Sequence, residues 1–173
     1  MNIWSGIYSG FTNENQSANV FIHPKWVTKS IERLAILQRG DVHSRKQVTT
    51  IDSGTLAIAM VCATLTKKQP LILDIGGNLG QTALMLSMSL KYRNVRWVVI
   101  ERVDFLRECS KFLVLPSQVE FRSSMSEVDE NADVVHFGSS LQYFEDWKGS
   151  LGEAASTGAD WMGLPRVWLT PSL

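Results

Sequence analysis

Two acidic residues, Asp74 and Glu101, each stand at the end of an apolar run, where a side chain could contact a ligand. Asp74 precedes a glycine-bearing turn that runs from Gly76 to Gly80, and Glu101 lies 21 residues after Gly80. Open α/β sheets bind ligands at turns of this kind, and an acid roughly 20 residues beyond the glycines contacts ribose hydroxyls there. The spacing therefore predicts a site for a ligand that contains a nucleoside.

The same turn argues against a ligand rich in phosphate. Asp74 would repel phosphate groups, and the spacing Gly76-x-x-x-Gly80 matches neither the dinucleotide motif nor a P-loop. S-adenosylmethionine carries no phosphate, and a nearby carboxylate would attract its ammonium group. We therefore expect the ammonium end of this cofactor beside Asp74 and Gly76, and its ribose beside Glu101.

A candidate base lies at the end of a later apolar run. His136 belongs to a predicted strand over residues 133–137, and Gly138 and Ser139 begin the exit from that strand at its ligand-facing end. Methyl transfer to a hydroxyl requires a group that takes the proton, and His136 is the best-placed residue for that role. Tyr143 and Gln142 are the alternatives, as residues that orient the substrate or pack against the cofactor.

Each of these residues also has a purely structural interpretation, which the sequence leaves open. Asp74 could cap its own turn, and Glu101 could form a salt bridge to Arg102 or Arg107. His136 could be a half-buried histidine that faces a neighbouring helix.

The elements that must position these residues alternate between strand and helix. Helices are predicted over residues 24–39 and 54–66, from residue 81, and over 104–115 and 147–156; strands are predicted over 71–75, 95–101, 119–122, 133–137 and 161–169. Such alternation favours parallel pairing through right-handed crossovers. The sequence thus predicts an α/β fold with about five mostly parallel strands and helices on both faces.

The predicted organisation has two parts packed as one globular unit. Residues 1–69 form an N-terminal arm and helices, and residues 70–173 form the Rossmann-like cofactor-binding part. The aromatic residues of the first 22 positions either pack on the core or form a lid over the cofactor.

Residues 74–80 resemble the Asp-x-Gly-x-Gly-x-Gly motif of class I S-adenosylmethionine-dependent methyltransferases, with Asn78 in place of the middle glycine. More narrowly, the chain resembles a group of bacterial methyltransferases that carry Trp-x-Gly-x-Tyr, Leu-Asp-x-Gly-Gly and Ser-Ser-x-Leu-Gln-Tyr. These motifs stand here at residues 4–8, 73–77 and 139–143. The likeness spans most of the chain.

The resemblance implies a three-layer Rossmann-like sheet, with S-adenosylmethionine as cofactor and S-adenosylhomocysteine as product. It also implies a small-molecule or saccharide acceptor. Ser123 and Ser124 occupy the place where this fold contacts adenine, although a plain turn explains them equally well. The cofactor-binding residues that we expect are Asp74, Gly76, Gly77, Asn78, Gly80, Glu101, Arg102, Ser123, Ser124, Gly138 and Ser139.

Composition narrows the functional classes further. Seventeen basic and seventeen acidic residues cancel, which argues against a large nucleic-acid footprint or a basic membrane-binding patch. Two isolated cysteines and the absence of a visible secretory signal predict a cytoplasmic protein. The longest apolar stretch is too short to span a bilayer. The three histidines have no Cys or acid at ligand spacing, so we expect no metal site.

Two other functions remain open at this stage. A non-catalytic or incomplete methyltransferase fold could act as a binding module, because related sheets have seven strands and this chain stops at Leu173. An NAD-dependent oxidoreductase or epimerase is the other alternative. The predicted last strand would form a sheet edge with apolar residues at 161–173. We therefore expect a homo-oligomer through that edge, cover from the N-terminal arm, or disorder of the tail.

Overall fold

The computed structural model describes residues 22–38, 53–89, 94–112, 114–115, 117 and 119–165. The strands are β1 (Leu71–Ile75), β2 (Arg96–Ile100), β3 (Val119–Arg122), β4 (Val134–His136) and β5 (Trp161–Gly163). The α-helices are α1 (Pro24–Gln38), α2 (Ser53–Thr64), α3 (Gln81–Ser89), α4 (Val103–Ser110) and α5 (Trp147–Ser156), and two short 3₁₀ helices are η2 (Met125–Glu127) and η3 (Leu141–Tyr143).

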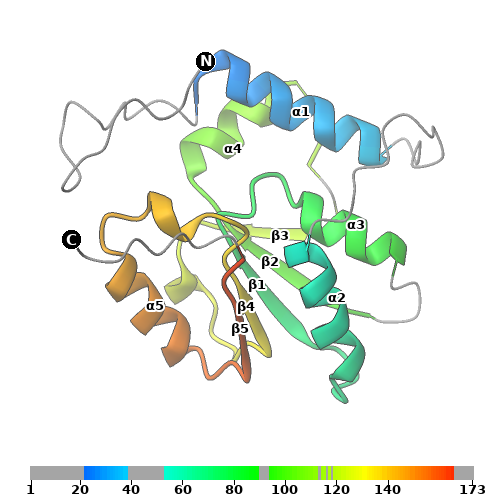
Figure 1. The fold of residues 1–173 in the computed structure, drawn as a ribbon. Coiled ribbons are helices and arrows are strands. Elements are labelled where there is room, and N and C mark those ends of the chain that lie inside the picture. The colour runs from blue at the N-terminus through cyan, green and yellow to red at the C-terminus, as the bar shows by residue number, and fades with distance from the viewer. Residues whose placement is uncertain are drawn as a thin grey trace.

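The five strands form one parallel sheet in the order β3-β2-β1-β4-β5 (Figure 1). After β3 the chain crosses to the other side of β1, so the strand order reverses between β1 and β4. Open α/β sheets bind ligands outside the carboxyl ends of the strands at such a reversal. The prediction of a Rossmann-like α/β sheet with helices on both faces is therefore confirmed.

Alternation along the strands explains the two cores. All five residues of β1 are buried, as expected for a strand covered on both faces. Ile72 faces α2 and α3, where it packs with Ile58 and Leu86. Leu73 faces the opposite side, where η2, η3 and α5 cover the sheet and Ala154 of α5 is fully buried. Figure 1 shows α2 and α5 on opposite sides of the sheet.

Helix α1 forms a further layer over α3 and α4 (Figure 1). Its buried residues are Val27, Ser30, Leu34 and Leu37, which recur at helical spacing. Leu34 packs with Leu79 and Phe105, so α1 is connected to the end of the glycine turn as well as to α4.

Most predicted elements appear with shifted ends. The helix predicted over residues 104–115 spans only Val103–Ser110, and Phe112, which lies beyond its end, is 70% exposed. The strand predicted over 133–137 is Val134–His136. The last strand ends at Gly163, and residues 166–173 lie outside the described part of the chain. The proposed division at residue 69 stays a prediction.

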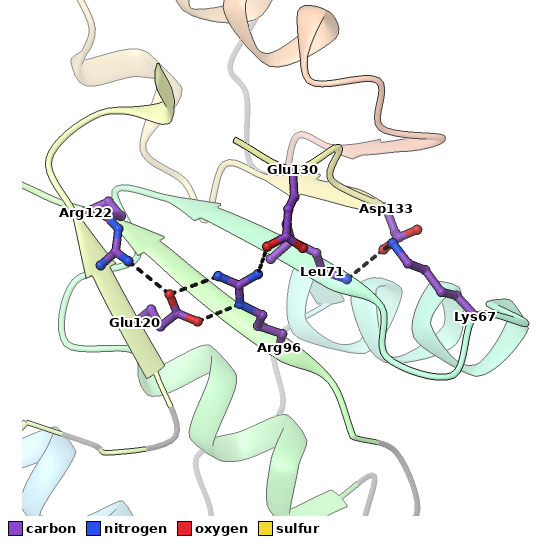
Figure 2. A network of polar contacts seen from close by, with 7 residues as sticks. All are labelled: Lys67, Leu71, Arg96, Glu120, Arg122, Glu130 and Asp133. Atoms are coloured by element: carbon purple, nitrogen blue, oxygen red, sulfur yellow. Dashed lines mark hydrogen bonds and ion pairs between the residues drawn. The ribbon is translucent and has the colours of Figure 1, made fainter. Parts of the chain in front are cut away.

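A polar network ties together the amino ends of the strands, opposite the edge of the sheet where the glycine turn lies (Figure 2). Arg96, the first residue of β2, contacts Glu120 of β3 at 2.6 Å and Glu130 at 2.5 Å. Asp133 accepts hydrogen bonds from the backbone of Leu71 at 2.7 Å and from Lys67 at 2.8 Å. These side chains are partly exposed, so each ion pair contributes about 0–1 kcal/mol. The network aligns strand starts and is not part of the candidate site.

Candidate functional site

The glycine turn after β1 requires an unusual backbone. Gly76 and Gly80 have φ values of +67° and +75°, in the left-handed region where glycine is favoured. Asn78, which stands where the resembling motif has its middle glycine, also has a positive φ of 58°. Asparagine tolerates this region better than most residues. The substitution of Asn for Gly therefore keeps the conformation of the turn.

Glu101 lies directly after β2 and faces this turn. Its Oε2 accepts a hydrogen bond from the backbone N–H of Asn78 at 3.0 Å, and its Oε1 accepts one from the N–H of Arg102 at 2.8 Å. Burial raises the pKa of the Glu101 carboxyl, although these two N–H donors partly oppose the shift. Each carboxylate oxygen can accept a further hydrogen bond, so Glu101 is placed to receive hydroxyl donors from a ligand.

Asp74 and His136 form a buried pair between β1 and β4. They are register partners across the two strands, and Asp74 Oδ1 lies 3.0 Å from His136 Nδ1. Asp74 is 0% exposed and His136 is 2% exposed. A carboxylate can only accept, so Nδ1 donates and a neutral His136 ring carries its free lone pair on Nε2. Neither Asp74 Oδ2 nor His136 Nε2 has a hydrogen-bond partner.

The turn covers Asp74. A Cβ added at Gly77 would lie 2.6 Å from Asp74 Cγ and 2.6 Å from Asp74 Oδ2, so only glycine fits above this carboxylate. Asp74 therefore lies beneath the turn and is paired with His136. Direct contact between Asp74 and a ligand ammonium stays a prediction.

The exit from β4 packs against the same turn. Ser139 has a φ of +67°, and it and Asn78 are the two non-glycine residues with positive φ in the described part of the chain. Such strained residues cluster at functional sites. Ser140 Oγ donates to the backbone oxygen of Ile75 at 2.5 Å, and a Cβ on Gly76 would lie 2.5 Å from Ser140 Cβ. Gly138 and Ser139 are thus held beside the glycine turn.

Three predicted residues have other local partners. Arg102 forms an ion pair with Asp104 at 2.6 Å. Among the residues that the structure describes, Glu101 forms no ion pair with Arg102 or Arg107. The Ser123 hydroxyl bonds to Glu127, and Ser124 Oγ caps η2 by accepting from the backbone N–H of Ser126 at 3.2 Å. The two serines lie just beyond the carboxyl end of β3, at the same edge of the sheet as Glu101.

Tyr143 ends η3 and is half-buried, after the segment that leads out of β4. Its backbone N–H donates to the oxygen of Ser140 at 2.9 Å. The preceding side chain, Gln142, donates to the backbone oxygen of Ser139. The role of Tyr143 as a substrate-orienting residue stays a prediction.

Sequence reasoning missed one contributor from the N-terminal helix. Ser30 of α1 accepts a hydrogen bond on Oγ from Asn78 Nδ2 at 3.1 Å, and its backbone oxygen accepts one from Gln81 Nε2 at 3.4 Å. Ser30 is a polar residue on the otherwise apolar buried face of α1. That exception to the helical pattern was the available signal.

Within the described ranges, no group of three or more His, Cys, Asp or Glu side chains could hold a metal ion. The helices of the same ranges include none that is long and apolar enough to cross a membrane.

No protein-family model matches the chain, and no curated protein matches it in sequence. Solved structures do match. The plantazolicin methyltransferase BamL, in complex with a triazolic desmethylPZN analog and S-adenosylhomocysteine, aligns with a TM-score of 0.53 at 14% identity, over 82% of this chain and 51% of that chain. A protein of Methanococcus maripaludis classed as an S-adenosyl-L-methionine-dependent methyltransferase aligns with a TM-score of 0.50 at 14% identity, over 86% of this chain and 61% of that chain.

These similarities establish the fold. The chain has the Rossmann-like fold of S-adenosylmethionine-dependent methyltransferases, and it spans between one half and two thirds of the length of these two structures.

Proposed function

We propose that this protein binds S-adenosylmethionine at the carboxyl ends of β1, β2 and β4 and transfers its methyl group to a small-molecule or saccharide acceptor. The observation that carries the proposal is the placement of Glu101 beside the glycine turn, where its carboxylate is fixed by the N–H groups of Asn78 and Arg102. The fold shared with BamL, which was solved with S-adenosylhomocysteine, supports the same cofactor.

The residues present fit this cofactor. Glu101 would accept hydrogen bonds from the ribose hydroxyls. The Asp74 carboxylate, which is hydrogen-bonded to His136, lies directly beneath Gly77, where a negative charge favours the ammonium end of the cofactor above Gly76. A buried carboxylate with an unpaired oxygen is the kind of group that a bound cation would satisfy.

The remaining predicted contacts lie around this pair. We assign Arg102, Ser123 and Ser124, which lie beyond the carboxyl ends of β2 and β3, to the adenine side of the cofactor. Gly138 and Ser139 lie on the β4 side, next to the turn formed by Gly76, Gly77, Asn78 and Gly80. The motifs at residues 73–77 and 139–143 support the narrower bacterial group named above.

The cofactor supplies an activated methyl group on a sulfonium sulfur, so the protein mainly has to orient the reactants and exclude water. His136 is the residue that we assign to take a proton from a hydroxyl acceptor, through Nε2. Asp74 is a positioning residue, because its hydrogen bond keeps the proton on Nδ1 and leaves Nε2 free to accept. Tyr143 is assigned to orient the acceptor.

Titration calorimetry with S-adenosylhomocysteine tests the cofactor site. Glu101→Ala should weaken binding by about 1.5–3 kcal/mol, the scale for a hydrogen bond to a charged group. The matched control is Glu153→Ala, because Glu153 is an exposed residue of α5 on the far side of the sheet. Equal affinity of Glu101→Ala and wild-type protein would remove Glu101 from the site.

A thermal-shift comparison with S-adenosylmethionine, S-adenosylhomocysteine and NAD tests the class of ligand. We expect the first two compounds to raise the melting temperature and NAD to leave it unchanged. Stabilisation by NAD alone would overturn the proposal in favour of an oxidoreductase. Cofactor binding without turnover of any acceptor would favour a non-catalytic binding module.

A further inference from the structure

A cleft of about 320 Å³ lies between α2 and the strands β4 and β5. Its walls include Ala57, Ile58 and Val61 from α2 and Trp161 and Gly163 from β5. The volume falls within the range of about 300–1,000 Å³ that is usual for small-molecule sites. The helix α2 runs antiparallel to β1 (Figure 1), so its first turns lie at the same end of the sheet as the glycine turn. The cleft is therefore a neighbour of the proposed cofactor site and distinct from it.

His136 forms part of the wall of this cleft. Its ring is 2% exposed, Nδ1 is occupied by Asp74, and Nε2 has no partner. An unpaired buried acceptor destabilises the protein, and a hydrogen-bond donor on a ligand would relieve this penalty. The lining residues include no Asp, Glu, Lys or Arg, so His136 Nε2 and the Trp161 indole provide the polar side-chain atoms of these walls.

Two glycines lie against the edge of the buried His136 ring that carries Nε2. A Cβ on Gly138 would lie 3.1 Å from His136 Cε1, and a Cβ on Gly163 would lie 3.4 Å from His136 Cδ2. Cε1 and Cδ2 are the two ring atoms bonded to Nε2. A larger side chain at either position would crowd the edge that carries the free lone pair.

The chemistry of these walls defines the ligand. The body of the ligand has to be apolar and neutral, because α2 and β5 present mainly aliphatic and aromatic surface. Its polar group has to be a donor, because Nε2 accepts. A saccharide would leave most of its hydroxyls without partners in such a cleft, at a cost for each one.

We propose that this cleft binds the methyl acceptor, and that the acceptor is a neutral aromatic or alicyclic alcohol whose hydroxyl donates to His136 Nε2. The claim that the ligand is the methyl acceptor rests on the proposed function, whereas the claim that this cleft binds a ligand does not. Asp74 then serves both sites, because it lies beneath the glycine turn and holds His136 by Nδ1.

The test uses 2-naphthol as the probe and 2-methoxynaphthalene as the matched compound without a donor. The chain contains three histidines, so ¹⁵N-histidine NMR can resolve the His136 ring. Without probe, His136 should show the tautomer protonated at Nδ1. With 2-naphthol, the Nε2 resonance should move upfield as it accepts a hydrogen bond, and the methyl ether should bind about tenfold more weakly because it leaves Nε2 unpaired.

Two tryptophan substitutions on α2 give the matched controls. Ala57→Trp places a large ring in the wall of the cleft and should abolish 2-naphthol binding while leaving affinity for S-adenosylhomocysteine within about twofold. Met60→Trp changes a residue of the same helix that is 64% exposed and does not line the cleft, so it should leave both affinities unchanged.

The outcomes separate the two proposals. If S-adenosylhomocysteine binds but 2-naphthol causes no change at His136, or binds equally to Ala57→Trp, the cleft is not the acceptor site and the proposed function stands. If 2-naphthol binds as described and S-adenosylhomocysteine does not, the cleft is a ligand site and the methyltransferase proposal fails.

Discussion

Asp74 and His136 are hydrogen-bonded at 3.0 Å between neighbouring strands, in a place with almost no solvent access. The hydrogen bond supplies the Asp74 carboxylate with a donor and holds the His136 imidazole in one orientation. Their second polar atoms, Oδ2 and Nε2, are unpaired. The pair therefore stabilises the contact between β1 and β4, and its two unpaired atoms could each interact with a ligand. For this reason it connects the proposed cofactor site and the proposed acceptor cleft.

The stability of the fold should depend on this pair. His136→Ala leaves the Asp74 carboxylate buried without a partner, so we expect a loss of about 3 kcal/mol in the free energy of unfolding, the upper part of the range for a buried acceptor left unpaired. His136→Asn keeps a side-chain N–H near the position of Nδ1 and should lose less. Urea denaturation measures both values. A loss below about 1 kcal/mol for His136→Ala would show that Asp74 has no need of this partner.

Affinity for S-adenosylhomocysteine should fall in mildly acidic solution. Burial raises the pKa of the Glu101 carboxyl above its ordinary value of 4.5, so Glu101 takes up a proton at a higher pH than an exposed glutamate. Protonation removes acceptor capacity that the ribose hydroxyls would use. Calorimetry between pH 7.5 and 5 should show weaker binding as the pH falls. Glu101→Gln should bind weakly with no such dependence, and a parallel decline in that variant would assign the effect to another group.

Glu101 should also make the stability of the ligand-free protein depend on pH, in the opposite direction to the cofactor affinity. An acid with a raised pKa stabilises the folded state below its unfolded pKa, and this contribution is lost as the pH rises through the folded pKa. In the absence of ligand, the free energy of unfolding of wild-type protein relative to Glu101→Gln should therefore decrease with rising pH.

The glycine turn should not tolerate a methyl group at Gly77. A Cβ there would lie 2.6 Å from the buried Asp74 carboxylate, so Gly77→Ala should lower the free energy of unfolding by about 1–3 kcal/mol and weaken cofactor binding. Gly152→Ala is the control, because a Cβ at this exposed position in α5 meets nothing within 4 Å. That variant should gain about 0.5–1 kcal/mol. Equal behaviour of the two variants would contradict the close packing of the turn on Asp74.

We expect self-association through the edge strand β5. In the described sheet, β5 pairs with β4 on one side and has no strand partner on the other, while Trp161 and Met162 are 50% and 38% exposed. Unpaired backbone groups beside apolar side chains favour pairing between chains. Light scattering should give a mass above that of one chain, and Met162→Lys should lower it. Met60→Lys, on α2, serves as control. A monomeric wild-type protein at high concentration would exclude this interface.

Local patterns determined the elements that carry the site. The apolar run at Leu71–Ile75 and the glycines after it encode a buried strand and a left-handed turn through residue preferences alone, and both occur where the sequence predicts them. Helix ends were less predictable. The predicted helix over 104–115 ends at Ser110, because the choice between helix and turn there depends on packing and leaves Phe112 outside the core.

Tertiary structure alone decided which candidates meet. Asp74 and His136 are 62 residues apart, and their pairing follows from β4 lying next to β1 in register, which no local pattern specifies. Ser30 reaches the glycine turn only because α1 packs over α3. Sequence could identify acids, glycines and a histidine at strand ends, since these are local properties. Strand order and register come from burial of whole apolar faces, so the partner of each polar group emerged only from the assembled sheet.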